Sequence, residues 1–201
     1  MKMFFYGCGV IALLFGVVSF AAEPVTDKPE WESVLEKLDE QDSYKGEFTQ
    51  ERHLSILQMP LISKGHFAID KDQTIQWQVN EPFSVAFSYH KNTLQQCTNL
   101  QDEKSCRKVS KTDDPMLHGF FSFFAKVFSG SNEELTNWFD IESVTDESAV
   151  LMHPKKAFLK KVFSSIRIEH DTKKVTKVVI LETKQEQQQN ADKQILSFQY
   201  Q

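Results

Sequence analysis

The feature that most constrains the fold is a series of segments in which apolar and polar residues alternate. In residues 44–52 the alternation places Tyr44, Gly46 and Phe48 on one side and polar residues on the other. A period of two is typical of a strand that buries one face and exposes the other. Similar segments follow, joined by short polar connections, at residues 61–69, 75–79 and 83–89. Together they predict an antiparallel meander with one apolar face.

The second half of the chain begins with helical patterns and then returns to strands. Asp114 and Pro115 are typical of a helix start, and the Phe-rich residues 119–128 place aromatic rings most of the way round that helix. A capping box at residues 131–134 opens a short helix through Trp138. The later strands are predicted at residues 139–144, 148–153, 163–170, 174–183 and 194–201. The predicted fold class is therefore α+β, with mainly antiparallel β structure.

The N-terminus has the layout of an export signal. Lys2 precedes a charge-free apolar run over residues 4–20, and small residues stand before a predicted cleavage site after Ala21. The alternative is a transmembrane anchor, but the run is short for one and no basic cluster follows it. Residues 1–21 are thus predicted to be a signal peptide, and residues 22–201 a single domain that is soluble and monomeric in the periplasm.

A first helix is predicted directly after a short polar leader. Asp27 is placed to cap it, and the helix should end near residue 42. Its apolar face, at a spacing of three and four residues, consists of Trp31, Val34, Leu35 and Leu38.

Two cysteines remain once the predicted signal peptide is removed. Cys97 and Cys106 enclose a polar, turn-like segment, and the periplasm permits disulfides. The two side chains are expected to face each other across a hairpin and to form a disulfide. The alternative is a metal site, which lacks a His or a second Cys pair at ligand spacing.

Composition and motifs exclude several classes of function. The formal net charge is −5 without a basic stripe, which argues against nucleic-acid binding. The sequence has no Gly-rich phosphate loop and no nucleophile elbow, and its six His lack zinc-site spacing, so neither a cofactor nor a metal is expected. His53 and Ser55 could be two parts of a hydrolase triad, but a His near a Ser in a strand is more often structural. The chain is therefore predicted not to be an enzyme.

Two features of the sequence have both an ordinary and a functional interpretation. Of 17 Phe, four lie in residues 1–21, which leaves 13 for the mature chain. Such a surplus either forms an ordinary core between sheet and helices or lines a cavity that a lipid can fill, and composition does not separate the two. The second feature is a basic group that could touch anionic lipid headgroups or form a solvated loop, namely Lys155, Lys156, Lys160 and Lys161.

Several short motifs occur in one order along nearly the whole mature chain. They are the segment 44–50 with its Phe-x-Gln signature, Gly65-His66-Phe67, Trp77 to Pro82, the Phe-rich helix with Asn137-Trp138, and Leu151 to Lys155. In this order they resemble the LolA family, periplasmic carriers of outer-membrane lipoproteins. The resemblance implies an incomplete (half) β-barrel, with helices covering its concave face and an apolar cavity between them.

The resemblance also implies a function without bond-making chemistry. Family members hold acyl chains in the cavity and ferry a lipidated cargo from an inner-membrane donor to an outer-membrane acceptor. Residues 51–63 look closer to a divergent branch associated with glycolipid and aryl-polyene functions, so the cargo is expected to be a lipoprotein or a (glyco)lipid. Related half-barrels also serve in envelope signalling, so the alternative is a sensor or adaptor that binds a protein partner.

The alternation and the resemblance together predict which residues line the acyl-chain site. From the strands these are Phe48, Phe67, Trp77, Val79, Phe83, Val85 and Phe87, and from the Phe-rich lid helix Phe120, Phe121, Phe124 and Phe128. LolA tethers its lid with the Arg of an Arg-Pro pair, which residues 69–72 lack here. Arg52, on the apolar side of the first strand, is the candidate for a different tether.

Overall fold

The computed structural model describes most of the chain beyond the N-terminus. The described residues are 31–32, 43–70, 72–99, 101–128, 132–144, 148–171, 174–186, 188 and 190–201. Within these ranges no helix is both long and apolar enough to cross a membrane. The predicted signal peptide and most of the predicted first helix lie outside them. Trp31 and Glu32 are helical, and the Trp31 side chain is buried, as its place on the apolar face predicts.

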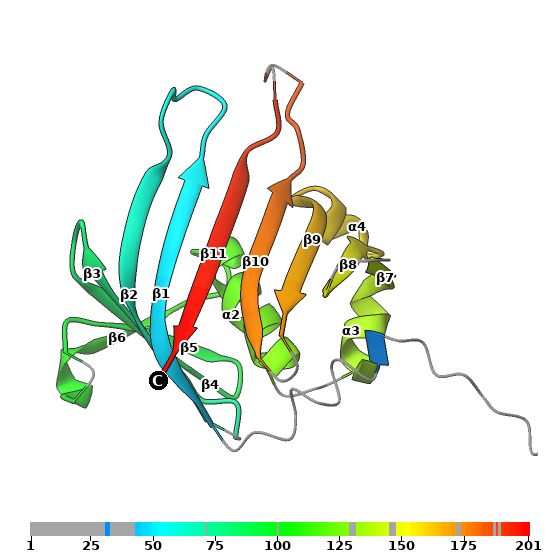
Figure 1. Ribbon diagram of the computed structural model, residues 1–201. Helices are drawn as coiled ribbons and strands as arrows, with labels where there is room; N and C mark the ends of the chain where they lie inside the picture. Colours follow the sequence, from blue (N-terminus) through cyan, green and yellow to red (C-terminus); the bar gives the residue numbers. More distant parts are fainter. Residues whose placement is uncertain are drawn as a thin grey trace, which may run out of the picture.

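One open antiparallel sheet of 11 strands forms the body of the molecule (Figure 1). Its strands are β1 (Ser43–His53), β2 (Leu61–Asp70), β3 (Ile75–Glu81), β4 (Val85–His90), β5 (Thr93–Cys97), β6 (Cys106–Val109), β7 (Phe139–Val144), β8 (Ala149–Pro154), β9 (Phe163–His170), β10 (Val175–Glu182) and β11 (Lys193–Tyr200). Their order in the sheet is β6-β5-β4-β3-β2-β1-β11-β10-β9-β8-β7. The first and last strands of the chain thus pair at the centre of the sheet and join its two halves.

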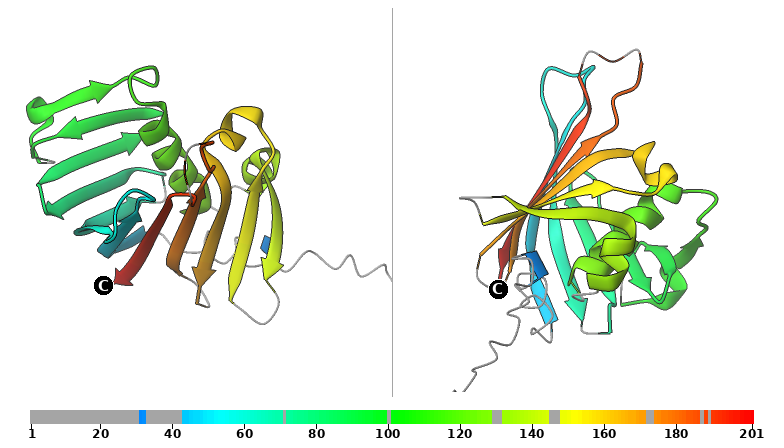
Figure 2. Two further views of the ribbon diagram at one scale, coloured as in Figure 1. Left: turned by 90° about the horizontal axis from the view of Figure 1, so that it is seen from above. Right: turned by 90° about the vertical axis from the view of Figure 1, so that its right-hand side faces the viewer.

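The helices lie on the concave side of this sheet. They are α2 (Pro115–Phe128), α3 (Asn132–Trp138) and α4 (Ala157–Lys160). A short 3-10 helix, η1 (Glu103–Ser105), lies apart from them in the connection between β5 and β6. Figure 2 shows α2 inside the curve of the sheet, between the half formed by β1 to β6 and the half formed by β7 to β11. The edge strands β6 and β7 are not neighbours, so the barrel is incomplete. The predicted half-barrel with helices over its concave face is confirmed.

Close packing at the centre of the sheet depends on Gly65. This residue pairs with Phe48 across β1 and β2, and the Phe48 ring stacks on Trp77 with 3.9 Å between the ring centroids. A Cβ at Gly65 would lie 1.9 Å from the carbonyl oxygen of Gln78 and 2.9 Å from the Phe48 ring. The absent side chain therefore leaves the space that the Phe48 ring needs to reach Trp77.

The predicted strands are present, with bounds that differ by one or two residues, and two local predictions are wrong. The fourth strand begins at Val85 because the chain turns at residues 81–84, so Phe83 lies in the turn and is 81% exposed. Residues 157–160 form the helix α4, so the solvated loop that was one of the two interpretations of this basic segment is not present there. Leu159 anchors this turn because its side chain is buried, while the lysines around it are exposed.

Cys97 and Cys106 form the predicted disulfide, which closes the hairpin between β5 and β6. Replacing both cysteines by serine is expected to lower the free energy of unfolding by about 2–3 kcal/mol, because the cross-link restricts the unfolded chain. Urea denaturation of the variant and of the oxidised protein measures the difference. Wild-type protein denatured under reducing conditions is the control and should show the same loss. A change below about 0.5 kcal/mol would contradict the prediction.

Candidate functional site

Helix α2 is fixed over the sheet by contacts at its first turn. The Asp114 Oδ1 atom accepts a hydrogen bond of 2.8 Å from the backbone N–H of Leu117 and so caps the helix. The imidazole of buried His118 donates from Nε2 to the carbonyl oxygen of Val109 at 2.7 Å, since a carbonyl can only accept. This second bond joins the first turn of α2 to the end of β6.

One side of α2 packs its aromatic rings against the first half of the sheet. The pairs and their centroid separations are Trp77–Phe120 (5.7 Å), Trp77–Phe124 (6.0 Å), Tyr89–Phe121 (6.1 Å) and Tyr44–Phe128 (5.1 Å). Separations of 4.5–7 Å are those of favourable aromatic pairs. These rings fill the concave space over β1 to β4, so this side of the helix belongs to the hydrophobic core.

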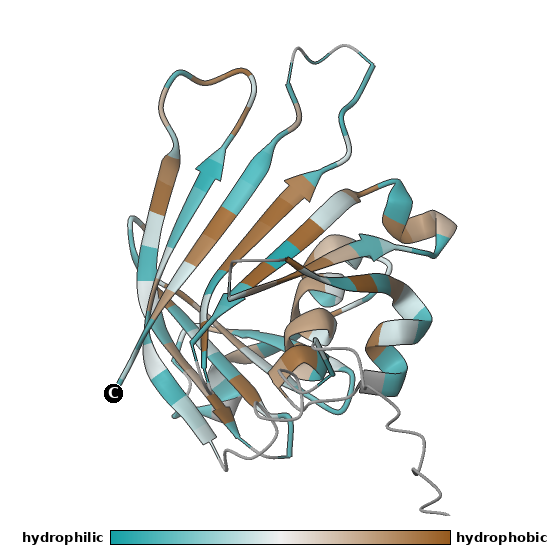
Figure 3. Cartoon of the chain, turned by 45° about the vertical axis from the view of Figure 1, so that its right-hand side comes forward, coloured by the Kyte–Doolittle hydropathy of each residue, from teal (hydrophilic) through white to brown (hydrophobic). Residues whose placement is uncertain are grey.

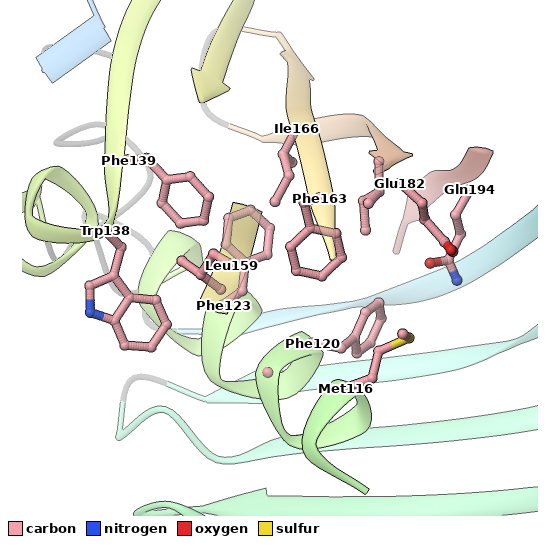
Figure 4. A pocket seen from close by; sticks show the side chains of 12 residues that line it. Met116, Phe120, Phe123, Trp138, Phe139, Leu159, Phe163, Ile166, Glu182 and Gln194 are labelled. Atoms are coloured by element: carbon pink, nitrogen blue, oxygen red, sulfur yellow. The ribbon is translucent and has the colours of Figure 1, made fainter. Parts of the chain in front are cut away.

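The other side of α2 borders an apolar pocket against the second half of the sheet (Figure 4). A Cβ added to Gly119 would meet no atom within 4 Å, so the helix surface is open at this point. The volume of the pocket is about 40 Å³. Its lining consists of Met116, Gly119, Phe120, Phe123, Trp138, Phe139, Leu159, Phe163, Ile166, Ile180, Glu182 and Gln194.

The pocket is polar at one end only. Figure 4 shows Glu182 and Gln194 together at one end and Trp138 at the other. A second hollow, of about 250 Å³, shares both polar residues and is lined in addition by Arg52 and Asp114. The guanidinium of Arg52 lies 3.7 Å from the carboxylate of Glu182. An apolar interior with a few polar groups at its mouth is the arrangement that an amphiphilic ligand requires.

Trp138, at the far end of the pocket, is contacted by a lysine of α2. The Lys126 ammonium lies 5.0 Å from the centroid of the indole ring and forms an ion pair with Glu134. Partial burial lowers the pKa of Lys126, because desolvation disfavours the charged form. The ion pair and the cation–π contact connect α2 to α3, so the two helices form one cover over the sheet.

The structure separates the predicted lining residues into three groups. Phe48, Phe67, Trp77, Phe121, Phe124 and Phe128 are buried in the core. Val79, Phe87 and Phe120 are partly buried against it, and Val85 is half-buried. Phe83 is exposed, which corrects its predicted place on the apolar face.

Sequence reasoning missed most of the pocket itself. Of the predicted set only Phe120 lines it, and the remaining partners come from the second half of the sheet and from α3 and α4. The alternating pattern of residues 163–170 and 174–183 could have identified some of these partners, since Ile166 and Ile180 are on the buried side of their strands. The prediction used only the strands of the first half.

Arg52 lies where a contact with the lid helix is possible. It lines the same hollow as Asp114 and Leu117 at the start of α2, but its ion pair is with Glu182 of β10. Its role as a tether stays a prediction.

Within the described residues, His53 and Ser55 do not form part of a catalytic triad. The His53 imidazole is hydrogen-bonded to Glu51 at 3.3 Å, and the backbone N–H of Ser55 donates to Asp192 at 2.7 Å. The buried Ser55 hydroxyl has no hydrogen-bond partner there. In the same part of the chain no three His, Cys, Asp or Glu side chains gather as metal ligands would.

Comparisons with known proteins place this geometry in a family. The model of the family described as outer membrane lipoprotein carrier protein LolA-like matches residues 21–193. No curated protein matches the chain.

Solved structures of low sequence identity are also similar to the chain. MucB in the MucA/MucB complex from Pseudomonas aeruginosa is 15% identical, with a TM-score of 0.42. That match covers 84% of this chain but 53% of the other, so the chain spans about half of that protein. The LolA superfamily protein NE2245 from Nitrosomonas europaea is 10% identical, with a TM-score of 0.42 and coverage of 84% and 90%. A putative outer membrane lipoprotein-sorting protein domain from Vibrio parahaemolyticus is 11% identical, with a TM-score of 0.40 and coverage of 85% and 91%.

The family model covers most of the chain, from before β1 through β10, together with the helices that cover the concave face, and it ends at Lys193, the first residue of β11. The chain belongs to the LolA-like family of outer membrane lipoprotein carrier proteins.

Proposed function

We propose that the protein is a periplasmic, non-enzymatic carrier that binds the acyl chains of a lipoprotein or (glyco)lipid and ferries them toward the outer membrane. The observation that carries the proposal is the apolar pocket between α2 and the second half of the sheet, with polar groups at one end. An inner-membrane donor would load this site, and an outer-membrane acceptor would unload it.

The energetics of acyl chains favour a protein cavity for their transport. Each methylene removed from water contributes about 0.8 kcal/mol, so a 16-carbon chain exposes roughly 12 kcal/mol of unfavourable contact that a carrier relieves. The acyl chain would occupy the apolar interior, and the polar head would stay near Glu182 and Gln194 at the mouth. The neighbouring hollow gives that head room beside Arg52.

Binding requires α2 to move, because the present pocket is too small for a whole acyl chain. Its volume of about 40 Å³ is far below what a 16-carbon chain needs. Phe120 and Phe123 line it from α2, so a shift of that helix enlarges the pocket on the side of β9 and β10. The lid is thus expected to open around the cargo and to close when the cargo leaves.

Acyl-chain binding is tested directly with protein isolated from the periplasm. Native mass spectrometry should show a discrete adduct of lipid mass, and organic extraction should identify its class. In parallel, a fluorescent fatty acid should bind the delipidated protein with a dissociation constant in the micromolar range or below. A clean apo mass together with no binding of the probe would refute the carrier function.

The second candidate is an envelope sensor or adaptor that binds a protein. One observation favours it. The chain's own aromatic rings already fill the concave face over β1 to β4. A carrier must move such rings to make room for an acyl chain, whereas a protein that binds a partner on its outer surface can keep them in place. Under this alternative the apolar probe does not bind, and an inner-membrane protein co-purifies in stoichiometric amount.

A further inference from the structure

The turn between β1 and β2 carries an unusual group of exposed apolar side chains. The most exposed are Ile56 (84%) and Met59 (77%) at its tip, with Leu61 (52%), Ile62 (50%) and Leu57 (44%) beside them. We call residues 54–62 the hairpin tip. Figure 1 shows it projecting beyond the body of the sheet, and Figure 3 shows its hydrophobic residues in brown. A contiguous exposed group of this kind marks a contact surface and costs solubility if it has no partner.

Hydrogen bonds hold the hairpin tip to its neighbours in the sheet. The backbone N–H of Ser55 donates to the Asp192 carboxylate at 2.7 Å, and the Asp192 carbonyl accepts from the Glu182 N–H at 2.9 Å. The next residue, Thr183, donates from its hydroxyl to the carbonyl of Lys160 at 2.8 Å. A chain of bonds therefore runs from the hairpin tip to the end of α4.

Helix α4 adds positive charge at the same end of the molecule. Its segment has four exposed lysines and no acidic residue, and the aromatic ring between them is 61% exposed: Lys155, Lys156, Phe158, Lys160 and Lys161. Lys155 pairs with Asp140 at 3.1 Å. Within the described residues no carboxylate lies in ion-pair range of the other three lysines. The formal charge of the whole chain is −5, so this local excess of positive charge is a specific feature of α4.

Few acidic groups at this end oppose that charge. Glu51 contacts His53, Glu182 contacts Arg52, and Asp192 accepts the hydrogen bond from Ser55. The remaining exposed carboxylate of the β10–β11 loop, Glu186, stands near Lys184 in sequence.

We propose that this end of the molecule docks on an anionic lipid bilayer, with the hairpin tip in the membrane interface and the α4 lysines at the headgroups. The order in depth fits the fold, because the hairpin tip projects farther than α4 in Figure 1. A lipid surface explains both features together, since apolar side chains enter the interface while lysines attract phosphate. A protein partner, in contrast, would not require an apolar tip and lysines without ion-pair partners to occur together.

Docking at this end would present the mouth of the pocket to the membrane. Arg52, Glu182 and Gln194 lie at the ends of β1, β10 and β11 from which the two hairpins continue. The proposal goes beyond cargo binding and does not depend on it, because vesicle binding is measured with no cargo present.

Flotation of the purified protein with vesicles of phosphatidylethanolamine and phosphatidylglycerol tests the proposal. The wild-type protein should float with these vesicles, weakly or not at all with pure phosphatidylcholine vesicles, and less at high salt. The triple variant Lys156→Gln, Lys160→Gln, Lys161→Gln should bind about 100-fold more weakly, since each lysine near an anionic surface contributes a factor of about five. Ile56→Ser with Met59→Ser should lower the affinity by about tenfold or more.

Matched controls lie on the first half of the sheet. Phe83→Ser removes an equally exposed apolar side chain from another turn, and Lys104→Gln, Lys108→Gln, Lys111→Gln removes the same charge from exposed positions near the β5–β6 hairpin. Both controls should retain at least a third of wild-type affinity. Failure of the wild-type protein to bind anionic vesicles would overturn the proposal. An equal loss in test and control variants would overturn the assignment to this end, because binding would then follow total charge or total apolar surface.

Discussion

A large side chain at position 119 is expected to abolish acyl-chain binding while the protein stays folded. In Gly119→Trp the new side chain starts from a Cβ that meets no atom within 4 Å and extends into the pocket between α2 and β9. The dissociation constant of a fluorescent fatty acid should rise by 100-fold or more, because the indole occupies the space that the first methylenes need. The free energy of unfolding should fall by no more than about 1–3 kcal/mol, because the indole is larger than the present pocket and α2 must shift to admit it.

Gly119→Ala is the matched control for this prediction. It replaces the same glycine with little added volume, so its affinity for the probe should stay within about threefold of wild type, and its free energy of unfolding should rise by about 0.5–1 kcal/mol. Urea denaturation of both variants measures the free energy of unfolding. If Gly119→Trp bound the probe as tightly as Gly119→Ala, acyl chains would not enter between α2 and β9. Because the test separates folding from binding, a loss of affinity cannot be attributed to a damaged core.

The sequence predicted the sheet well because alternation is a local signal. Each of β1, β2, β3, β7 and β9 reads as a period-two segment with recognisable ends, and the Phe-rich α2 reads as a helix that needs burial on several sides. The pairing of β1 with β11 joins residues about 150 positions apart. The residues alone carry no signal for that pairing, and only the family resemblance implied the half-barrel that contains it.

The site was predicted less well, for two physical reasons. An apolar residue in a period-two pattern is assigned to a face, but the pattern does not say whether that face meets a cavity or a packed ring. Trp77 and Phe163 have similar patterns, yet Trp77 stacks on Phe48 in the core and Phe163 lines the pocket. Turns also break the assignment, as at Phe83, where the strand begins two residues later than the alternation suggested.

Truncation of Trp77 is expected to show that the aromatic face over β1 to β4 is structural core. Its indole is 4% exposed, stacks on Phe48 at 3.9 Å and lies 5.7 Å from Phe120 and 6.0 Å from Phe124. Trp77→Ala should lower the free energy of unfolding by about 3–5 kcal/mol, because it leaves a cavity between the sheet and α2. For a domain of this size that is a large part of the total stability.

Phe83→Ala is the control, because the same alternation assigned both residues to one apolar face. Phe83 is 81% exposed, so its removal should change the free energy of unfolding by no more than about 0.5 kcal/mol. Thermal and urea denaturation of both variants decide the matter. Near wild-type stability of Trp77→Ala would mean that α2 does not press on the sheet in solution. The indole would then line an open cavity, and the acyl chain would lie over β1 to β4 instead of beside Gly119.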